Sequence, residues 1–202
     1  MTVHSMFSVP IIHYEIENWE FNKKRILDAL PPECPEHADP QDHGLYTDFF
    51  LTAAEGVTEM PSYSKTVIDI IKPYLADFSG ERRIEFTDMW YQKYYKGVQH
   101  SYHNHGHSGW SSVIFVEFDP ELHEATQFIS PFNNIWNGNL EIFQPPVKEG
   151  DMILFPSTIA HEAPPNRSDT RRTIVSYNLR GHTDTVKATL WEGLPFITKL
   201  AP

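Results

Sequence analysis

The sequence changes after Ser79 from helical periodicity to a series of short strand-like segments, and this change limits the fold more than any other feature. The later segments are rich in β-branched and aromatic residues, and clusters of Pro, Gly, Asn and Asp separate them. Several short strands at such spacing are typical of an antiparallel sandwich or barrel. We expect these strands at residues 83–95, 113–118, 140–143, 152–155 and 173–179.

The first eighty residues predict a short strand and two supporting helices. Residues 7–14 have strand character, and Pro10 favours an edge position. Asn18 can cap a helix over residues 19–30, and a second helix begins near Ser62 or Ser64. Pro73 inside the second helix predicts a kink or a break. The expected buried faces are Phe21, Ile26, Leu27 and Leu30 on the first helix, and Val67, Ile68, Ile71, Leu75 and Phe78 on the second.

Three segments have no clear secondary structure in the sequence. Residues 31–60 are rich in Pro, Asp, Glu and Gly and predict a long surface connection. Residues 119–138 are longer than a usual hairpin loop and predict either an insertion or a lid. Residues 181–202 form either a small strand or an arm packed on the body. We expect a single domain, with 1–80 as support, 83–180 as the β core and 181–202 as an arm.

Composition excludes several classes of protein. The 202 residues hold 16 Lys and Arg against 27 Asp and Glu, a net charge of −11, which argues against binding to nucleic acid or anionic membranes. No apolar run approaches the length of a membrane span, and residues 1–13 lack the pattern of a signal peptide. The single cysteine, Cys34, permits no internal disulfide. It favours a reducing compartment, so we expect a cytoplasmic protein.

Histidine is the anomaly, because four of the eleven fall at positions 100, 103, 105 and 107. On a strand, residues i and i+2 project to one face, about 6.5–7 Å apart. His103 and His105 would therefore offer two imidazoles to one metal ion, and imidazole suits Fe, Zn, Cu and Ni alike. His161, shortly after the strand at 152–155, is the best third ligand. The alternative is a solvated histidine-rich loop, and we expect His100 and His107 to be bystanders.

One arginine follows this series. In the strand at 173–179, Arg172, Ile174, Ser176 and Asn178 share a face, so Arg172 could enter the barrel as a cation. A guanidinium is the natural bidentate partner of a carboxylate. The ordered series of an H-x-H pair, a distant histidine and an arginine predicts a metal site beside an anion site.

At these residues the chain resembles the iron(II)- and 2-oxoglutarate-dependent oxygenases, and more narrowly the phage and bacterial oxygenases related to prolyl 4-hydroxylases. The resemblance is carried by Trp90 with Gln92, by HNHGHSGWSSVIFV from His103, by PPVKEGDMILFPSTIAH ending at His161, and by RTIVSYN from Arg172. It implies a mainly β fold with supporting α-helices, a double-stranded β-helix (jelly-roll, cupin-like). It also implies cofactors: Fe(II), 2-oxoglutarate as cosubstrate, and O2.

The resemblance also implies residue roles. His103, His105 and His161 would hold the metal and form the catalytic centre, and Arg172 would bind the distal carboxylate of 2-oxoglutarate. Ser176 and Tyr94 are further contacts expected for the cosubstrate. Position 105 departs from the usual H-x-D or H-x-E pair, because it is a histidine, and three neutral ligands leave the charge of the ion less compensated. Asp151 and Glu141 are carboxylates nearby in sequence, but nothing in the sequence places either on the metal.

The implied activity is a dioxygenase that decarboxylates 2-oxoglutarate to succinate and CO2 while hydroxylating a C–H bond. The rivals are a non-catalytic metal-binding jelly-roll module and a cupin-type three-histidine metalloenzyme that does not use 2-oxoglutarate. Trp90, Tyr102 and Trp110 could wall the pocket. The sequence leaves open a small-molecule or peptidyl substrate and the oligomeric state, a homodimer included.

Overall fold

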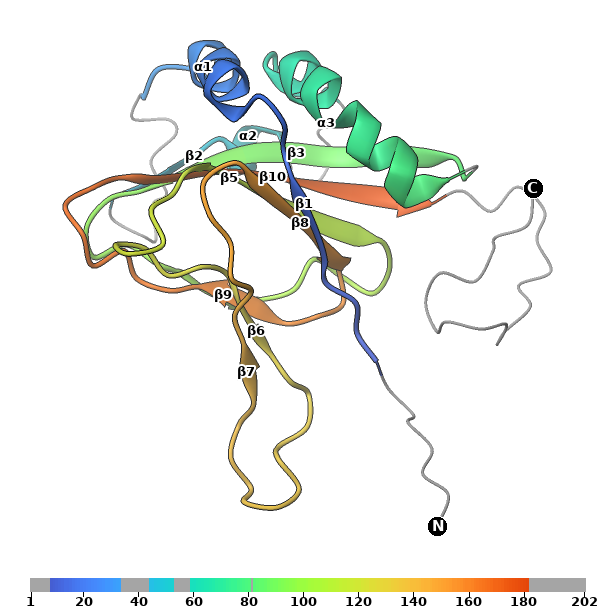
Figure 1. Ribbon diagram of the computed structural model, residues 1–202, viewed down its shortest axis with the longest axis vertical. Coiled ribbons are helices and arrows are strands. Elements are labelled where there is room, and N and C mark those ends of the chain that lie inside the picture. The colour runs from blue at the N-terminus through green and yellow to red at the C-terminus, as the bar shows by residue number, and fades with distance from the viewer. Residues whose placement is uncertain (1–7, 34–43, 53–58, 81, 182–202) are drawn as a thin grey trace.

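Two helices cover one face of a six-stranded sheet, and a four-stranded sheet lies against its other face (Figure 1). This computed structural model describes residues 8–33, 44–52, 59–80 and 82–181. Every pairing in both sheets is antiparallel, and the two sheets form the expected jelly-roll.

The strand order follows the layers. In the large sheet the order is β1 (Ile12–Glu15), β8 (Asp151–Pro156), β5 (Trp110–Glu117), β10 (Arg172–Gly181), β3 (Ile84–Tyr94) and β2 (Leu45–Thr47). In the small sheet it is β4 (His100–His103), β9 (His161–Ala163), β6 (Gln127–Ile129) and β7 (Ile142–Phe143). The helices are α1 (Trp19–Ala29), the short α2 (Phe49–Thr52) and α3 (Ser64–Ser79).

Strand β10 separates two hydrophobic cores by the alternation of its side chains. Val175 and Tyr177 face the helices, where they join Ile26 of α1 and Ile71 of α3 in one buried cluster. Ile174 faces the other way and packs between the two sheets in a second cluster. The prediction that Arg172, Ile174 and Ser176 share the inner face is thus confirmed, because this face holds the site described below.

The helices differ in detail from their predictions. Asn18 occupies the cap position of α1 in a left-handed conformation (φ 52°), but its side chain makes no capping hydrogen bond. Phe21 is 67% exposed, so its prediction as a core residue is wrong, whereas Ile26 is fully buried. Of the kink or break expected at Pro73, the break is wrong, because α3 runs through this residue. Burial of Ile70, Ile71 and Leu75 against the sheet offsets the lost hydrogen bond.

Two connections contain more structure than the sequence indicated. The segment 31–60 includes β2 and α2, and pairing of β2 with β3 buries Leu45. The segment 119–138 contributes β6 to the small sheet, and the chain between β6 and β7 projects from the body (Figure 1). The structure therefore favours the insertion over the lid. Part of the first predicted strand (residue 7), part of 31–60 and the arm after 181 lie outside the described residues.

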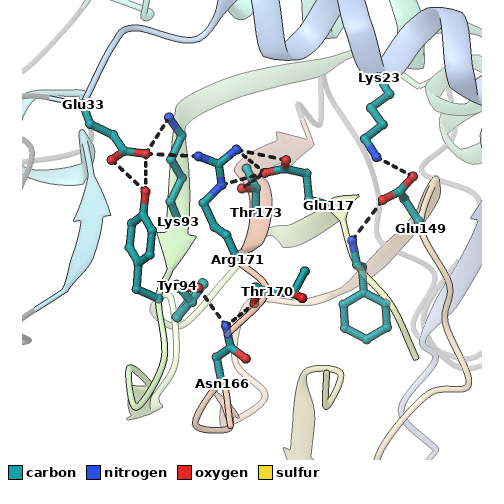
Figure 2. A network of polar contacts seen from close by, with 12 residues as sticks. Lys23, Glu33, Lys93, Tyr94, Glu117, Glu149, Asn166, Thr170, Arg171 and Thr173 are labelled. Carbon is teal, nitrogen blue, oxygen red and sulfur yellow. Dashed lines mark hydrogen bonds and ion pairs between the residues drawn. The ribbon is translucent and has the colours of Figure 1, made fainter. Parts of the chain in front are cut away.

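A polar network ties the end of α1 to the large sheet (Figure 2). Arg171 donates to both carboxylate oxygens of Glu117 at 2.9 Å and lies 3.3 Å from Glu33, which follows α1. Lys93 of β3 also pairs with Glu33 at 3.3 Å. Burial opposes ionisation of Glu117, but hydrogen bonds from Arg171 and Thr173 hold its pKa below the usual value. No helix in the described part of the chain is long and apolar enough to cross a bilayer.

Two substitutions on α1 test the assignment of its faces. Ile26→Ala should lower the free energy of unfolding by about 2–5 kcal/mol, because it leaves a cavity in the core between helices and sheet. Phe21→Ala on the same helix should change it by less than about 0.5 kcal/mol. Urea unfolding followed by circular dichroism measures both, and a larger loss from Phe21→Ala than from Ile26→Ala would contradict this assignment.

Candidate metal centre

The structure brings His103, His105 and His161 together. One ring nitrogen from each lies within 4.8 Å of the others. His103 ends β4 and His161 begins β9, and the two are direct partners in the ladder between these strands. The Nε2 atoms of His105 and His161 are 3.2 Å apart. Two nitrogens that each lie about 2.1 Å from one ion, at a right angle, would be separated by about 3 Å. The cluster therefore has the dimensions of a metal site.

The middle histidine reaches the cluster in a way that the sequence did not predict. His103 and His105 do not share one strand face, because β4 ends at His103 and His105 lies in the following loop. Backbone bonds hold this loop instead. The N–H of His105 donates to the Ser157 carbonyl at 2.9 Å, and the N–H of Ser157 donates to the Gly109 carbonyl at 3.0 Å. Ser157 belongs to the turn that precedes His161, so one turn positions two of the three imidazoles.

Backbone carbonyls select the tautomer of the other two histidines. His103 Nδ1 lies 2.6 Å from the Ser101 carbonyl, and His161 Nδ1 lies 2.9 Å from the Ile159 carbonyl. A carbonyl only accepts, so each Nδ1 carries the proton and donates it. The lone pair is then on Nε2, the other ring nitrogen. Both rings are therefore fixed in the form that binds a metal.

Electrostatics keep all three rings neutral. Burial lowers the pKa of His103, and burial with repulsion from neighbouring imidazoles lowers the pKa of His105 to about 3. The pKa of His161 falls to about 4, chiefly because of burial and then because of His103. Only neutral imidazole binds a metal, so the cluster is competent at neutral pH. Among the described residues, the cluster contains no carboxylate.

His100 is a neighbour of the cluster that sequence reasoning undervalued. Its ring stacks on His103 with centroids 4.1 Å apart, and its Nδ1 lies 3.0 Å from Nε2 of Gln92. The expectation that it is not a ligand agrees with the geometry, but it supports a ligand ring. Two features of the sequence indicate this role: His100 lies three residues before His103, and Gln92 lies on the preceding strand. His107 is exposed and does not join the cluster.

The remaining predicted residues gather at one inner cavity. Tyr94, Ser176 and Ile174 line it together with the three histidines. A second small cavity shares Ile174, Thr126 and Ala163 with the first, and Arg172 forms part of its wall. The Arg172 guanidinium lies over the Tyr94 ring, 4.2 Å from its centroid. Arg172 and the histidine cluster therefore line two cavities that have Thr126, Ala163 and Ile174 in common.

The two adjacent arginines have opposite environments. Arg171 forms ion pairs with the carboxylates of Glu117 and Glu33 in the network of Figure 2, and its hydrogen bonds to Glu117 raise its pKa. Arg172 is 2% exposed and donates only to the carbonyls of Glu124 and Pro164, at 2.8 and 2.9 Å. Burial lowers its pKa, the charge of Glu124 acts in the opposite direction, and within the described residues Arg172 forms no ion pair at contact distance. A buried cation without a carboxylate in direct contact is costly unless an anion binds there.

Two of the three aromatic residues expected at the pocket are present. Trp90 lines the inner cavity, and Tyr102 lines a wider groove on the other side of the histidines. Trp110 has the other role open to these aromatic residues, that of a packing residue, because it contacts Phe78 of α3 at 5.0 Å between ring centroids, on the helix side of the sheet. Asp151 pairs with His13 at 2.8 Å and Glu141 accepts from Asn134, so neither approaches the cluster.

Comparison with known proteins agrees with this site. Residues 88–178, which include every proposed ligand, match the model of the family described as "Putative 2OG-Fe(II) oxygenase". The chain is therefore similar to the iron(II)- and 2-oxoglutarate-dependent oxygenases over residues 88–178, the part that carries the site. No curated protein matches the chain.

Solved structures share the fold at low sequence identity. An oxidoreductase of the 2OG-Fe(II) oxygenase family from Burkholderia pseudomallei is 14% identical, with a TM-score of 0.57 over 84% of this chain and 83% of that one. The viral collagen prolyl hydroxylase of Paramecium Bursaria Chlorella virus-1 is 13% identical, with a TM-score of 0.53 over 84% and 94%. The epimerase SnoN of nogalamycin biosynthesis, in complex with Fe3+ and alpha ketoglutarate, is 12% identical, with a TM-score of 0.57 over 94% and 92%. The fold thus serves more than one reaction.

Metal binding to the three histidines should stabilise the chain. With Ni(II) at about 100 times its Kd, binding adds about 2.7 kcal/mol, which corresponds to a rise of about 5–10 °C in Tm. His161→Ala should abolish this rise. His107→Ala, from the same stretch but outside the cluster, should retain it. Differential scanning calorimetry with and without Ni(II) measures the effect, and an equal rise in both variants would show that the metal binds elsewhere.

Proposed function

We propose that this protein is an Fe(II)- and 2-oxoglutarate-dependent dioxygenase that hydroxylates a C–H bond of its substrate. The overall reaction consumes 2-oxoglutarate and O2 and gives succinate, CO2 and the hydroxylated product. His103, His105 and His161 would hold the metal, whose redox chemistry drives this reaction when it is bound. Arg172 would bind the distal carboxylate of 2-oxoglutarate.

The observation that carries this proposal is the buried guanidinium of Arg172 beside a three-imidazole cluster. Its two hydrogen bonds go to backbone carbonyls, which orient the group but do not neutralise it. A five-carbon dicarboxylate has the matching chemistry, because one end can chelate a metal while the distal carboxylate reaches a cation. Tyr94, under the guanidinium, and Ser176, on the cavity wall, are the side chains expected to contact that carboxylate.

Binding of 2-oxoglutarate requires side chains to move. The inner cavity holds about 20 Å³ of free space, which is about the size of one water molecule. Thr126 and Ile174 line both this cavity and the one at Arg172, so these two side chains are the ones that would have to move. Rotamer changes are common when a ligand binds. The enclosed site would then exclude water from the reacting centre.

Two other functions use the same three histidines. A non-catalytic metal-binding module would bind the metal but would not turn over 2-oxoglutarate. A cupin-type metalloenzyme would react without it. The histidine at position 105 favours both alternatives, since the ligand cluster within the described residues has no acid. Arg172 favours the oxygenase, because neither alternative needs a buried cation. We further propose a cytoplasmic protein that acts on a small-molecule or peptidyl substrate.

Binding of 2-oxoglutarate tests the role of Arg172. With Ni(II) in place of iron and without oxygen, Arg172→Met should weaken binding at least about 30-fold, because a buried charge pair loses one partner. Arg171→Gln is the matched control and should leave the Kd within about threefold, since Arg171 faces the Glu117 network. Isothermal titration calorimetry measures both values. Equal effects of the two substitutions would remove Arg172 from the binding site.

Turnover tests the oxygenase itself. With Fe(II), oxygen and ascorbate, the wild type should release succinate from 2-oxoglutarate, and His161→Ala should reduce the rate to background. Arg172→Ala should reduce it mainly at low 2-oxoglutarate, because it weakens binding. The proposal fails if the wild type neither forms succinate nor binds 2-oxoglutarate. A wild type that binds the metal but not 2-oxoglutarate would favour the alternatives.

A further inference from the structure

A groove of about 530 Å³ is lined by His103 and His105 of the cluster, and Arg172 is not part of its lining. It opens where β2 and β4, each an edge strand of its sheet, border the site. His103 and His105 line both this groove and the inner cavity, so they form the wall between the two. A volume of this size falls within the usual range for small-molecule sites.

The groove is lined by four aromatic rings, by histidines and by neutral polar side chains. Phe49 and Phe50 come from α2, Tyr102 comes from β4, and Trp90 forms part of the floor. Phe49 holds the group together, with its ring 5.5 Å from Phe50 and 5.3 Å from Trp90 in edge-to-face contacts. No described lysine, arginine, aspartate or glutamate lines the groove, although the chain carries a net charge of −11.

Two of these rings are exposed in a way that suggests a ligand. Phe50 is 47% exposed and Tyr102 is 57% exposed, and the Phe50 ring contacts the half-buried Phe49 ring. Trp90 is buried, and its Nε1 has no hydrogen-bond partner among the described residues. The walls of the groove therefore offer ring surface together with the neutral polar side chains of Thr47, Gln92, Ser101 and Asn104. They offer no counter-charge.

We propose that this groove binds the substrate of the enzyme through an uncharged, ring-bearing group. The assignment deepens the proposed oxygenase function and rests on it, because the groove is a substrate site only if the histidines hold a reactive metal. Rings on the walls can stack with a ring of the ligand. In the metal-free chain a charged group would lose its hydration here without a partner of opposite charge among the lining side chains, so the groove itself favours a neutral group.

Three probes that share an indole ring test this selection. They are indole-3-acetamide, which is neutral, indole-3-acetate, which is an anion, and tryptamine, which is a cation. The full-length chain without added metal should bind the amide at least about tenfold more tightly than either charged probe. Ligand-observed NMR titration gives the three Kd values. Equal or tighter binding of tryptamine or indole-3-acetate would overturn the proposal.

Substitutions locate the binding. Phe50→Ala and Tyr102→Ala should each weaken binding of indole-3-acetamide about fivefold, because each removes one stacking surface. Both side chains are about half exposed, so the fold should survive. Trp136→Ala is the control, because Trp136 is 89% exposed and lies outside the groove. If Trp136→Ala has the same effect as the groove substitutions, the binding is nonspecific and the proposal is wrong.

The readout separates this proposal from the proposed function. Binding of the amide needs neither iron nor 2-oxoglutarate, whereas succinate release needs both. If the chain binds the amide in the groove but releases no succinate, the groove assignment stands and the proposed oxygenase function fails. If the chain releases succinate but shows no preference for the neutral probe, the proposed oxygenase function stands and the groove assignment fails.

Discussion

The two-residue alternation of β10 determines which side chains can meet in this protein. Val175 and Tyr177 contact the helices, while Arg172, Ile174 and Ser176 face the space between the sheets. A shift of one residue would exchange the two sets and bury Arg171 in place of Arg172. The register is fixed on both sides, because β10 pairs with β3 along its length and with β5 on the other edge. The hydrophobic cores and the site therefore depend on one pairing.

The charge balance of the site follows from the same arrangement. Three neutral imidazoles leave a divalent ion with its full charge, and Arg172 adds another positive charge nearby. A dicarboxylate would compensate for much of this charge, which an H-x-D site would do in part with its own acid. Under the proposed function, the anionic cosubstrate would contribute more to retention of the metal here than in a site with a carboxylate ligand.

Much of the site could be predicted from the sequence, because strand alternation and ligand chemistry are local properties. The spacing of Arg172 and Ser176 on one strand is sufficient to place both side chains on one face. The position of His161 after a turn is sufficient to place it near the other histidines. His105 belongs to the predicted cluster, but not through a strand face shared with His103. A loop held by a backbone hydrogen bond to Ser157 brings it there. Long-range pairing explains what was missed. Strand β2 has only three residues and forms by contact with β3, and its neighbour α2 supplies aromatic rings that look like surface loop in the sequence.

The anchoring of His105 outside the strand ladder has a consequence for the chemistry that this scaffold can host. Its backbone is fixed by Ser157, and its side chain takes no part in a cross-strand pair. Its ring nevertheless packs against Trp90 and His161, with centroids 5.4 and 5.1 Å apart, so replacing it would alter packing at the site without removing a ladder hydrogen bond. An acid at this position would be buried and would need a metal as its counter-charge. A change of charge at position 105 is therefore coupled to metal binding rather than to the pairing of the sheets.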